Sequence, residues 1–218
     1  MAKKNKRDEF LALIPDTVKT ILDVGCGDGG LALKLKSPGR KITGIEKHEE
    51  LCAIAGKKMD AIFCGDVETA EFVFEKKGFD CILYTDALEH LIDPLAVLKK
   101  HQDYLCDGGL VLASIPNIRY YKAILNLAVK GVWDYTEKGI LDRSHLRFYT
   151  LLNIEELFFE AGLEIITIRR NIIASRMMRF VDTLFLGCLK DLVTYQYYVL
   201  AQKKDGAITK QTRVKMQF

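Results

Sequence analysis

The chain has 218 residues, 49% of them hydrophobic, and a net charge of +3. This size and apolar content favour one domain with a substantial core. The charge is uneven, because residues 1–10 carry +2 and residues 203–218 carry +4, which leaves −3 on the body between them. A slightly acidic body argues against a nucleic-acid groove, so we expect no nucleic-acid partner.

Strands and helices alternate through the first half of the chain. Hydrophobic runs predict strands at 20–24, 41–46, 61–64, 79–84 and 109–115, with helices near 28–36, 48–58, 68–76 and 93–105 between them. This alternation predicts a parallel sheet covered by helices on both faces, with a ligand at the carboxyl ends of the strands. After a helix at 151–161, strands at 163–169 and 195–202 are expected to form an antiparallel edge pair.

Two segments interrupt this scheme. Residues 117–149 contain a predicted helix over 118–130, and the pattern of residues 171–192 predicts another amphipathic helix. Long insertions in a compact domain are typically lids or binding loops. We therefore expect a single domain over 1–203 with lid insertions at 117–149 and 171–192, followed by a basic, flexible tail over 204–218.

The cysteines show no C-x-x-C spacing, which argues against a zinc site and a disulfide framework. Buried free thiols in a reducing compartment are the simpler expectation. No signal peptide is visible and no apolar run is long enough to span a bilayer, so we expect a cytoplasmic protein without a transmembrane segment. The six cysteines are Cys26, Cys52, Cys64, Cys81, Cys106 and Cys188.

A glycine turn follows the first predicted strand. Gly25 and Gly27 place bare backbone between this strand and the next helix, a geometry that lets a ligand approach closely. With Gly30 they also fit G-x-G-x-x-G, the dinucleotide fingerprint, which is weak evidence when it stands alone.

Three acids follow three successive strands and favour a different ligand. Asp23 would repel a pyrophosphate and attract a cationic group. Glu46 ends the second strand, where a carboxylate can accept both ribose hydroxyls, and Asp66 follows the third strand, where it can accept an adenine amino group. A cation, a ribose and an adenine without phosphate describe S-adenosylmethionine.

Several motifs resemble those of the class I S-adenosylmethionine-dependent methyltransferases. They are residues 23–27 (DVGCG), Glu46, Gly65–Asp66 and residues 79–90 (FDCILYTDALEH); residues 86–94 (DALEHLIDP) are similar to the small-molecule branch that includes the ubiquinone-biosynthesis O-methyltransferases. The resemblance implies a three-layer α/β/α Rossmann-like sandwich with a mixed seven-stranded sheet in the order 3-2-1-4-5-7-6. It also implies a cofactor site formed by Asp23, Gly25, Cys26, Gly27, Glu46, Lys47, Asp66, Val67, Thr85 and Asp86.

Two histidines are candidates for the general base that an oxygen acceptor requires. His90 follows the fourth strand and His145 lies in the first insertion. Purely structural roles are equally open for both. A less favoured alternative is a divalent-ion site, because Asp86, Glu89 and His90 are spaced to share one helical face and the first insertion could bring His145 to them. These residues resemble the E-x-x-E-H pattern of metal-assisted O-methyltransferases, with Asp86 in place of the first Glu.

These observations predict methyl transfer from S-adenosylmethionine to a small-molecule acceptor, with oxygen as the favoured atom. The acceptor would be sugar-, quinone- or lipid-like, and the sequence leaves its identity and the oligomeric state open. Two alternatives remain at this stage: an NAD(P)-dependent oxidoreductase, and a methyltransferase-like protein that binds the cofactor without catalysis.

Overall fold

The computed structural model describes residues 6–184 and 189–203. Seven strands form one sheet in the order β3-β2-β1-β4-β5-β7-β6, as predicted. Neighbouring strands from β3 to β5 pair in parallel, whereas β7 is antiparallel to both β5 and β6. The strands are β1 (Thr20–Val24), β2 (Lys41–Glu46), β3 (Ala61–Cys64), β4 (Phe79–Thr85), β5 (Leu105–Pro116), β6 (Leu163–Ile172) and β7 (Thr194–Lys203).

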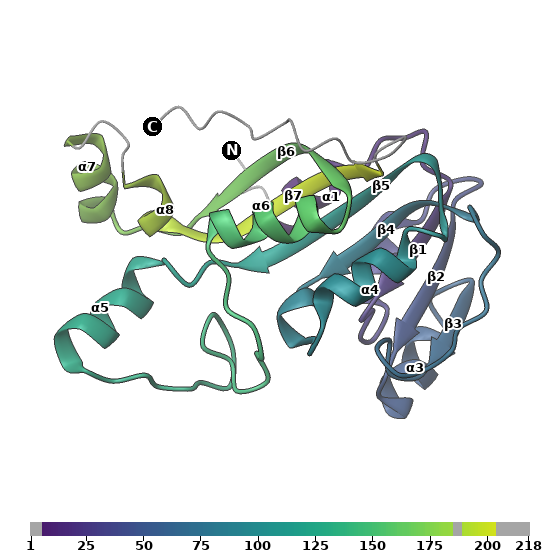
Figure 1. The fold of residues 1–218 in the computed structure, drawn as a ribbon, viewed down its shortest axis with the longest axis horizontal. Coiled ribbons are helices and arrows are strands. Elements are labelled where there is room, and N and C mark those ends of the chain that lie inside the picture. The colour runs from purple at the N-terminus through teal and green to yellow at the C-terminus, as the bar shows by residue number, and fades with distance from the viewer. Residues whose placement is uncertain (1–5, 185–188, 204–218) are drawn as a thin grey trace.

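Helices cover both faces of this sheet and confirm the three-layer architecture (Figure 1). One core lies under α4 (Pro94–His101) and α6 (Leu151–Glu160), and the other lies under α1 (Lys6–Leu11), α2 (Gly30–Leu35) and α3 (Glu49–Ala55). Side chains alternate along β1, so Ile21 enters the second core and Leu22 the first. Asp23 therefore faces the same side of the sheet as Ile21.

The predicted helix over 68–76 is wrong: residues 71–75 run as irregular chain between β3 and β4. Phe72 and Phe74 both pack on Phe63, with ring centroids 6.2 and 4.8 Å away, and Phe74 also meets Phe79 and Tyr104. Two residues that are two apart can share one face of an extended chain but not of a helix. Burial of both rings in one aromatic cluster therefore overrides the helical pattern.

The first predicted insertion follows β5 and the second follows β6, and Figure 1 shows their helices α5 (Tyr121–Lys130), α7 (Arg176–Leu184) and α8 (Lys190–Val193) together at one end of the molecule. The Tyr120 hydroxyl donates to the Ile173 carbonyl at 2.9 Å, and the Asn117 amide donates to the Asp191 carbonyl at 2.7 Å. The amphipathic segment at 171–192 thus contains two helices rather than one. The predicted tail at 204–218 lies outside the described residues.

Two of the cysteines contradict the expectation of free thiols. Cys52 of α3 and Cys64 at the end of β3 form a disulfide, with their Cα atoms 5.9 Å apart. Their separation of 12 residues gives no local signal; the packing of α3 on β2 and β3 brings them together. Cys26, Cys81 and Cys106 are free thiols, and Cys188 lies outside the described residues. No helix in the described part of the chain is both long and apolar enough to cross a membrane.

Candidate active site

A cavity of about 290 Å³ opens at the carboxyl ends of β1, β2 and β4, where a ligand is expected in an open parallel sheet. Six of the ten predicted cofactor residues line it, together with the predicted catalytic His90. The lining residues are Val24, Gly25, Ile45, Glu46, Lys47, His48, Leu51, Gly65, Asp66, Val67, Asp86, Ala87, His90, Leu91 and Ser144.

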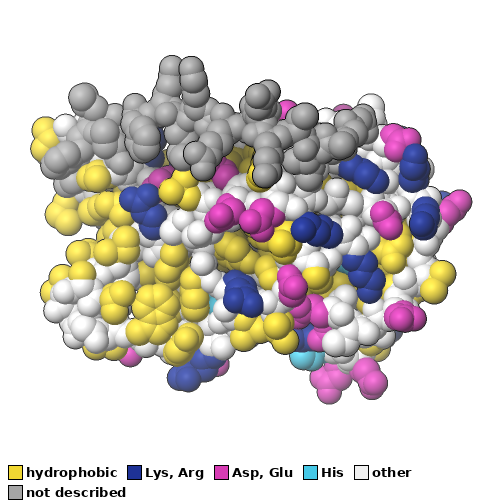
Figure 2. Space-filling view, in the orientation of Figure 1, with side chains coloured by type: hydrophobic (Ala, Val, Ile, Leu, Met, Phe, Trp, Pro, Cys, Tyr) yellow, Lys and Arg dark blue, Asp and Glu magenta, His cyan; other side chains and the backbone are white. Residues whose placement is uncertain are grey.

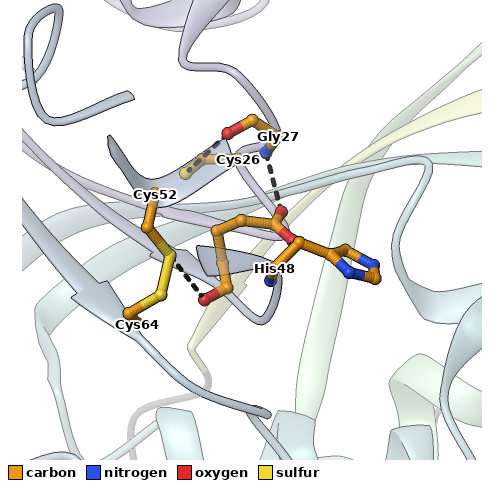
Figure 3. Close-up of a disulfide and its surroundings, with 6 residues drawn as sticks. Cys26, Gly27, His48, Cys52 and Cys64 are labelled. Carbon is orange, nitrogen blue, oxygen red and sulfur yellow. Dashed lines mark hydrogen bonds between the residues drawn. A yellow bond between two sulfur atoms is a disulfide. The ribbon is translucent and has the colours of Figure 1, made fainter. Parts of the chain in front are cut away.

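Glu46 is the buried acid of this cavity, with 6% of its surface exposed. Its Oε2 accepts a hydrogen bond from the Gly27 amide and its Oε1 accepts one from the His48 amide, both at 3.0 Å (Figure 3). A carboxylate has about four acceptor positions, so two remain for a ligand. A pair of adjacent hydroxyl groups, such as those of a ribose, suits this capacity.

The glycine turn after β1 is folded onto the end of β2. The amides of Gly25 and Cys26 both donate to the Ile45 carbonyl, at 2.9 and 3.0 Å. Gly25 has φ +70° and lines the cavity, and a Cβ there would lie 3.4 Å from the Ala87 Cβ. The Gly27 amide already donates to Glu46, so it is not available to a pyrophosphate, and this disfavours the dinucleotide interpretation.

The turn after β3 forms the opposite wall. Its Gly65 amide donates to the Glu46 carbonyl at 2.8 Å, which places Asp66 and Val67 beside the cavity. Val67 is buried, whereas Asp66 is exposed and its Oδ1 accepts from the Glu68 amide at 2.8 Å. An apolar side chain next to a solvent-facing carboxylate suits a flat heterocycle with an amino group at its edge.

Four predicted cofactor residues are not among those that line the cavity: Asp23, Cys26, Gly27 and Thr85. Asp23 is 1% exposed, and neither of its carboxylate oxygens has a hydrogen-bond partner among the described residues. Burial raises the pKa of Asp23 to about 7, with Arg7 opposing the shift and Glu46 adding to it. Burial also raises the pKa of the Cys26 thiol to about 12.

Asp86 lines the cavity in a strained conformation, with φ +53°. Its Oδ1 accepts a hydrogen bond from the Ser114 hydroxyl at 3.0 Å and another from the Gln196 amide nitrogen. These contacts come from β5 and β7 and hold the carboxylate in place, so Asp86 does not share one face with Glu89 and His90 as the helical spacing predicts.

The structure brings His90 and His145 together, although they come from different segments. His90 ends the single 3₁₀ turn η1 (Leu88–His90) after β4, and His145 belongs to the first insertion. Their rings meet edge to face with centroids 4.8 Å apart. His90 lines the cavity, whereas His145 is buried behind it, and burial lowers the pKa of His145.

Glu89, which the sequence indicates through its spacing with Asp86 and His90, is a buried acid next to the cavity. It is 1% exposed, and neither carboxylate oxygen has a hydrogen-bond partner in the described residues. Burial, with a smaller contribution from Asp86, raises its pKa well above the usual range. The backbone carbonyl of Glu89 accepts from the amides of Leu146 and Arg147, at 2.9 and 3.0 Å, and so attaches the first insertion to η1.

Eight lining residues were predicted neither as cofactor residues nor as catalytic residues: Val24, Ile45, His48, Leu51, Gly65, Ala87, Leu91 and Ser144. The glycine before Asp66 and the apolar positions on either side of Glu89 carry a weak signal, because they flank predicted site residues. Ser144 carries none, since only the fold brings the first insertion to this cavity.

The model of a methyltransferase domain family matches residues 2–168. Ubiquinone biosynthesis O-methyltransferases are similar in sequence: that of Dinoroseobacter shibae is 33% identical over 150 residues, covering 66% of this chain and 59% of the relative. That of Coxiella burnetii is 31% identical over 135 residues, covering 55% of this chain and 56% of the relative. The matched region thus spans little more than half the length of these curated relatives.

Solved structures share the fold. An S-adenosylmethionine-dependent methyltransferase of Thermotoga maritima superposes with a TM-score of 0.64 at 18% identity, covering 91% of this chain and 88% of its own. The [4+2]-cyclase SpnF superposes with a TM-score of 0.65 at 19% identity, covering 92% of this chain and 80% of its own. At this identity the likeness concerns the fold alone. The sequence match and the sheet order together show that the chain belongs to the methyltransferase domain family, as its motifs predict.

Proposed function

We propose that the chain transfers a methyl group from S-adenosylmethionine to an oxygen atom of a small molecule. The observation that carries the proposal is the Glu46 carboxylate, buried at the end of β2 between the glycine turn and the Gly65–Val67 turn. The similar relatives are named O-methyltransferases of ubiquinone biosynthesis, which supports oxygen as the acceptor atom and a quinone-like ring as the first acceptor class to test.

The described residues fit this cofactor. The free acceptor positions of Glu46 would take the ribose hydroxyls, Val67 would pack on the adenine and Asp66 would accept from its amino group. The bare backbone at Gly25 gives room for the methionine part, and the buried charge of Asp23 favours a cation nearby. No lysine or arginine other than Lys47 lines the cavity among the described residues, which suits a ligand without phosphate.

S-adenosylmethionine, when bound, supplies an electrophilic methyl group on a sulfonium. The residues of the chain would hold the acceptor oxygen in line with that methyl group, and positioning of this kind can contribute roughly 7–11 kcal/mol to catalysis. The oxygen forms a bond to the methyl carbon, the carbon–sulfur bond breaks, and the hydroxyl proton must leave. His90 and His145 are the proposed catalytic residues, because His90 lines the cavity and could act on that proton, and the His145 ring packs against it.

The first insertion offers an apolar approach for the acceptor. Figure 2 shows hydrophobic side chains gathered over the end of the molecule that carries α5. Within α5, Leu125, Leu127 and Val129 are 50%, 48% and 75% exposed. Ser144 of the same insertion lines the cavity, so this segment reaches the cofactor. An apolar ring or chain is therefore favoured over a free sugar.

Calorimetric titration of S-adenosylmethionine and S-adenosylhomocysteine into the purified protein tests the cofactor, with Glu46→Ala as the variant. We expect micromolar binding by the wild type and none by the variant. A panel of catechols and hydroxylated quinone precursors, assayed by mass spectrometry for a methyl gain, then tests the acceptor. Failure of folded, ligand-free protein to bind either compound would overturn the proposal.

Parallel titration of NADH and NADPH separates the oxidoreductase alternative, which predicts binding of a nicotinamide cofactor. Binding of S-adenosylmethionine without methylation of any acceptor pool would instead point to the non-catalytic alternative.

A further inference from the structure

We propose that the Cys52–Cys64 disulfide is a site of thiol–disulfide exchange with an external dithiol, and that its redox state sets the affinity of the cofactor cavity. The disulfide joins α3 to the end of β3, where Figure 3 shows the two half-cystines. Each is adjacent in the chain to a residue that lines the cavity, Leu51 before Cys52 and Gly65 after Cys64. The exchange is independent of the proposed function, whereas its effect on cofactor affinity rests on it.

The two half-cystines differ in their access to solvent. Cys64 is exposed at the edge of the sheet, because β3 is its terminal strand, whereas Cys52 of α3 is only 7% exposed. Exchange begins when a thiolate reaches one sulfur of a disulfide, so the exposed sulfur is the point of attack and the buried one is the leaving group. The mixed disulfide with the reductant therefore forms on Cys64.

The structure also accommodates Cys52 in its reduced form. Cys52 Sγ lies 3.2 Å from the Glu46 carbonyl oxygen, but a disulfide sulfur has no proton to donate to it. A thiol in the same place would donate to this carbonyl, whose other lone pair accepts from the Gly65 amide at 2.8 Å. The reduced cysteine thus finds a hydrogen-bond partner without a change of fold, as a reversible switch requires.

The turn after β3 is the wall of the cavity that depends on this cross-link. β3 has four residues and lies at the edge of the described sheet, paired with β2 alone. Opening of the disulfide leaves the turn attached through the Gly65 amide and the buried Val67 side chain. The two residues proposed to hold the adenine, Asp66 and Val67, therefore gain freedom on reduction, and ordering them again on binding weakens the affinity.

The exchange consists of two displacements. A thiolate of the dithiol bonds to Cys64 Sγ, and the Cys52–Cys64 bond breaks with its electron pair on Cys52, which takes a proton from water. The second thiolate of the reductant then bonds to the first and releases Cys64, which is also protonated. Two electrons and two protons pass from the dithiol to the protein, and the dithiol becomes a disulfide.

Cys26 belongs to the surroundings of this pair but takes no part in the exchange (Figure 3). It is buried, and burial raises the pKa of its thiol to about 12, so it carries its proton at neutral pH. The attacking species in thiol–disulfide exchange is a thiolate, so Cys26 does not compete with an external dithiol.

The redox state and the cofactor act on each other. If the oxidised protein binds S-adenosylhomocysteine more tightly than the reduced protein, the bound ligand must favour the disulfide by the same factor. A tenfold difference in affinity corresponds to a shift of about 30 mV in the reduction potential of this two-electron couple. The bound cofactor therefore protects its own site from reduction.

Equilibration of the native protein with mixtures of reduced and oxidised dithiothreitol tests the exchange. Acid quenching, alkylation and mass spectrometry then identify the reduced cysteines. We expect Cys52 and Cys64 to become alkylated together as the mixture becomes more reducing, while circular dichroism stays that of the folded protein. A disulfide that does not form on oxidation, or that opens only in urea, would overturn the proposal.

Two matched substitutions identify the point of attack. Cys52→Ser leaves the exposed Cys64 as a thiol, and Cys64→Ser leaves the buried Cys52. With oxidised glutathione, Cys52→Ser should form a mixed disulfide at least about tenfold faster than Cys64→Ser, because exchange requires access to the sulfur. Equal rates would contradict attack at Cys64. Cys106→Ser, which removes a free thiol elsewhere, should leave the dithiothreitol titration unchanged.

The same titration in saturating S-adenosylhomocysteine tests the link to the cavity. We expect the midpoint of the wild type to move to more reducing mixtures, by about 20–30 mV for a five- to tenfold difference in affinity. An unchanged midpoint, with calorimetry showing the ligand bound, would overturn the link. Absence of ligand binding in both redox states would instead overturn the proposed function, and the exchange at Cys64 would stand.

Discussion

Glu46 Oε2 accepts a hydrogen bond from the Gly27 amide at 3.0 Å, and this contact joins the end of β2 to the glycine turn after β1. The same carboxylate accepts from the His48 amide, at the entry to α3. Glu46 therefore orders two walls of the cavity while its remaining acceptor positions serve a ligand. Substitution of Glu46 should therefore weaken ligand binding in two ways, through the loss of direct hydrogen bonds to the ligand and through the loss of order in the cavity walls.

We predict that Glu46→Gln lowers the affinity for S-adenosylmethionine by about 10- to 100-fold, because hydrogen bonds to a charged group contribute about 1.5–3 kcal/mol. Glu46→Ala should lose more, because it also frees the Gly27 amide. Calorimetry measures both. Glu49→Gln, an exposed acid on the neighbouring helix, is the control, and an unchanged dissociation constant for Glu46→Gln would contradict the assignment.

The affinity for S-adenosylmethionine should depend on pH through Asp23. The pKa of this carboxyl is raised to about 7, chiefly by burial, so it is partly protonated at neutral pH. A cationic ligand favours the ionised form, and affinity should therefore rise between about pH 6 and about pH 7.5. Calorimetry across this range should show the rise in the wild type and a flat profile in Asp23→Asn; identical profiles would refute the role.

Asp23 should also make the fold less stable at high pH. The native state keeps this proton up to about pH 7, whereas the unfolded chain loses it near the ordinary value of 3.8. The free energy of unfolding therefore falls as pH rises through that window, by an amount of the order of 2–4 kcal/mol. Urea titration should find Asp23→Asn more stable than the wild type at about pH 8, with a much smaller difference at about pH 4.

His101 should contribute a pH dependence of the free energy of unfolding that has the opposite sign. Its Nδ1 lies 2.8 Å from the Tyr84 hydroxyl, and burial, with a smaller effect of Lys100, lowers its pKa from 6.5 to about 4. The unfolded chain takes up a proton below pH 6.5 while the native state does not, so stability is complete above that pH and falls toward pH 4. Urea titrations should show that the free energy of unfolding of His101→Gln no longer falls in this way between pH 6.5 and about pH 4. If it still falls, another group is responsible for the loss of stability in acid.

The Cys52–Cys64 disulfide should stabilise both the fold and the cofactor site. It closes a short loop, for which about 2–3 kcal/mol is expected, and it fixes α3 to β3, whose ends deliver His48 and Asp66 to the cavity. Cys64→Ser, or reduction verified by alkylation and mass spectrometry, should lower the melting temperature and weaken cofactor binding several-fold. Cys106→Ser, which removes a free thiol, should do neither.

The sequence predicted the centre of the sheet well because the central strands β1 and β4 are buried on both sides. Ile21, Leu22 and Val24 form a continuous apolar run that ends at glycines, and such a run is difficult to accommodate in any other element. The role of Glu46 as a ligand-binding residue was equally easy to predict, because an acid at the end of a buried strand has few structural explanations. The order of the strands in the sheet was predicted from the family resemblance rather than from the apolar pattern.

The features that were missed depend on contacts between distant segments. Phe72 and Phe74 do not form a helix because the Phe63 ring packs on both of them and the Tyr104 ring packs on Phe74. Local helix propensity carries no information about these contacts. The pairing of Cys52 with Cys64 likewise follows from helix packing. Glu89 was considered only within the less favoured divalent-ion alternative, and its burial without a hydrogen-bond partner among the described residues could not be predicted from the sequence.

The strand order separates the two halves of the molecule. Every described residue that lines the cavity lies between Val24 and Leu91, apart from Ser144, whereas both insertions follow β5 and β6. On the proposed function, we therefore expect the half that binds the methyl donor and the half that selects the acceptor to be modular. Residues 117–149 could be grafted from one member of the family to another to redirect the enzyme to a new acceptor, while the machinery that holds the methyl donor stays unaltered.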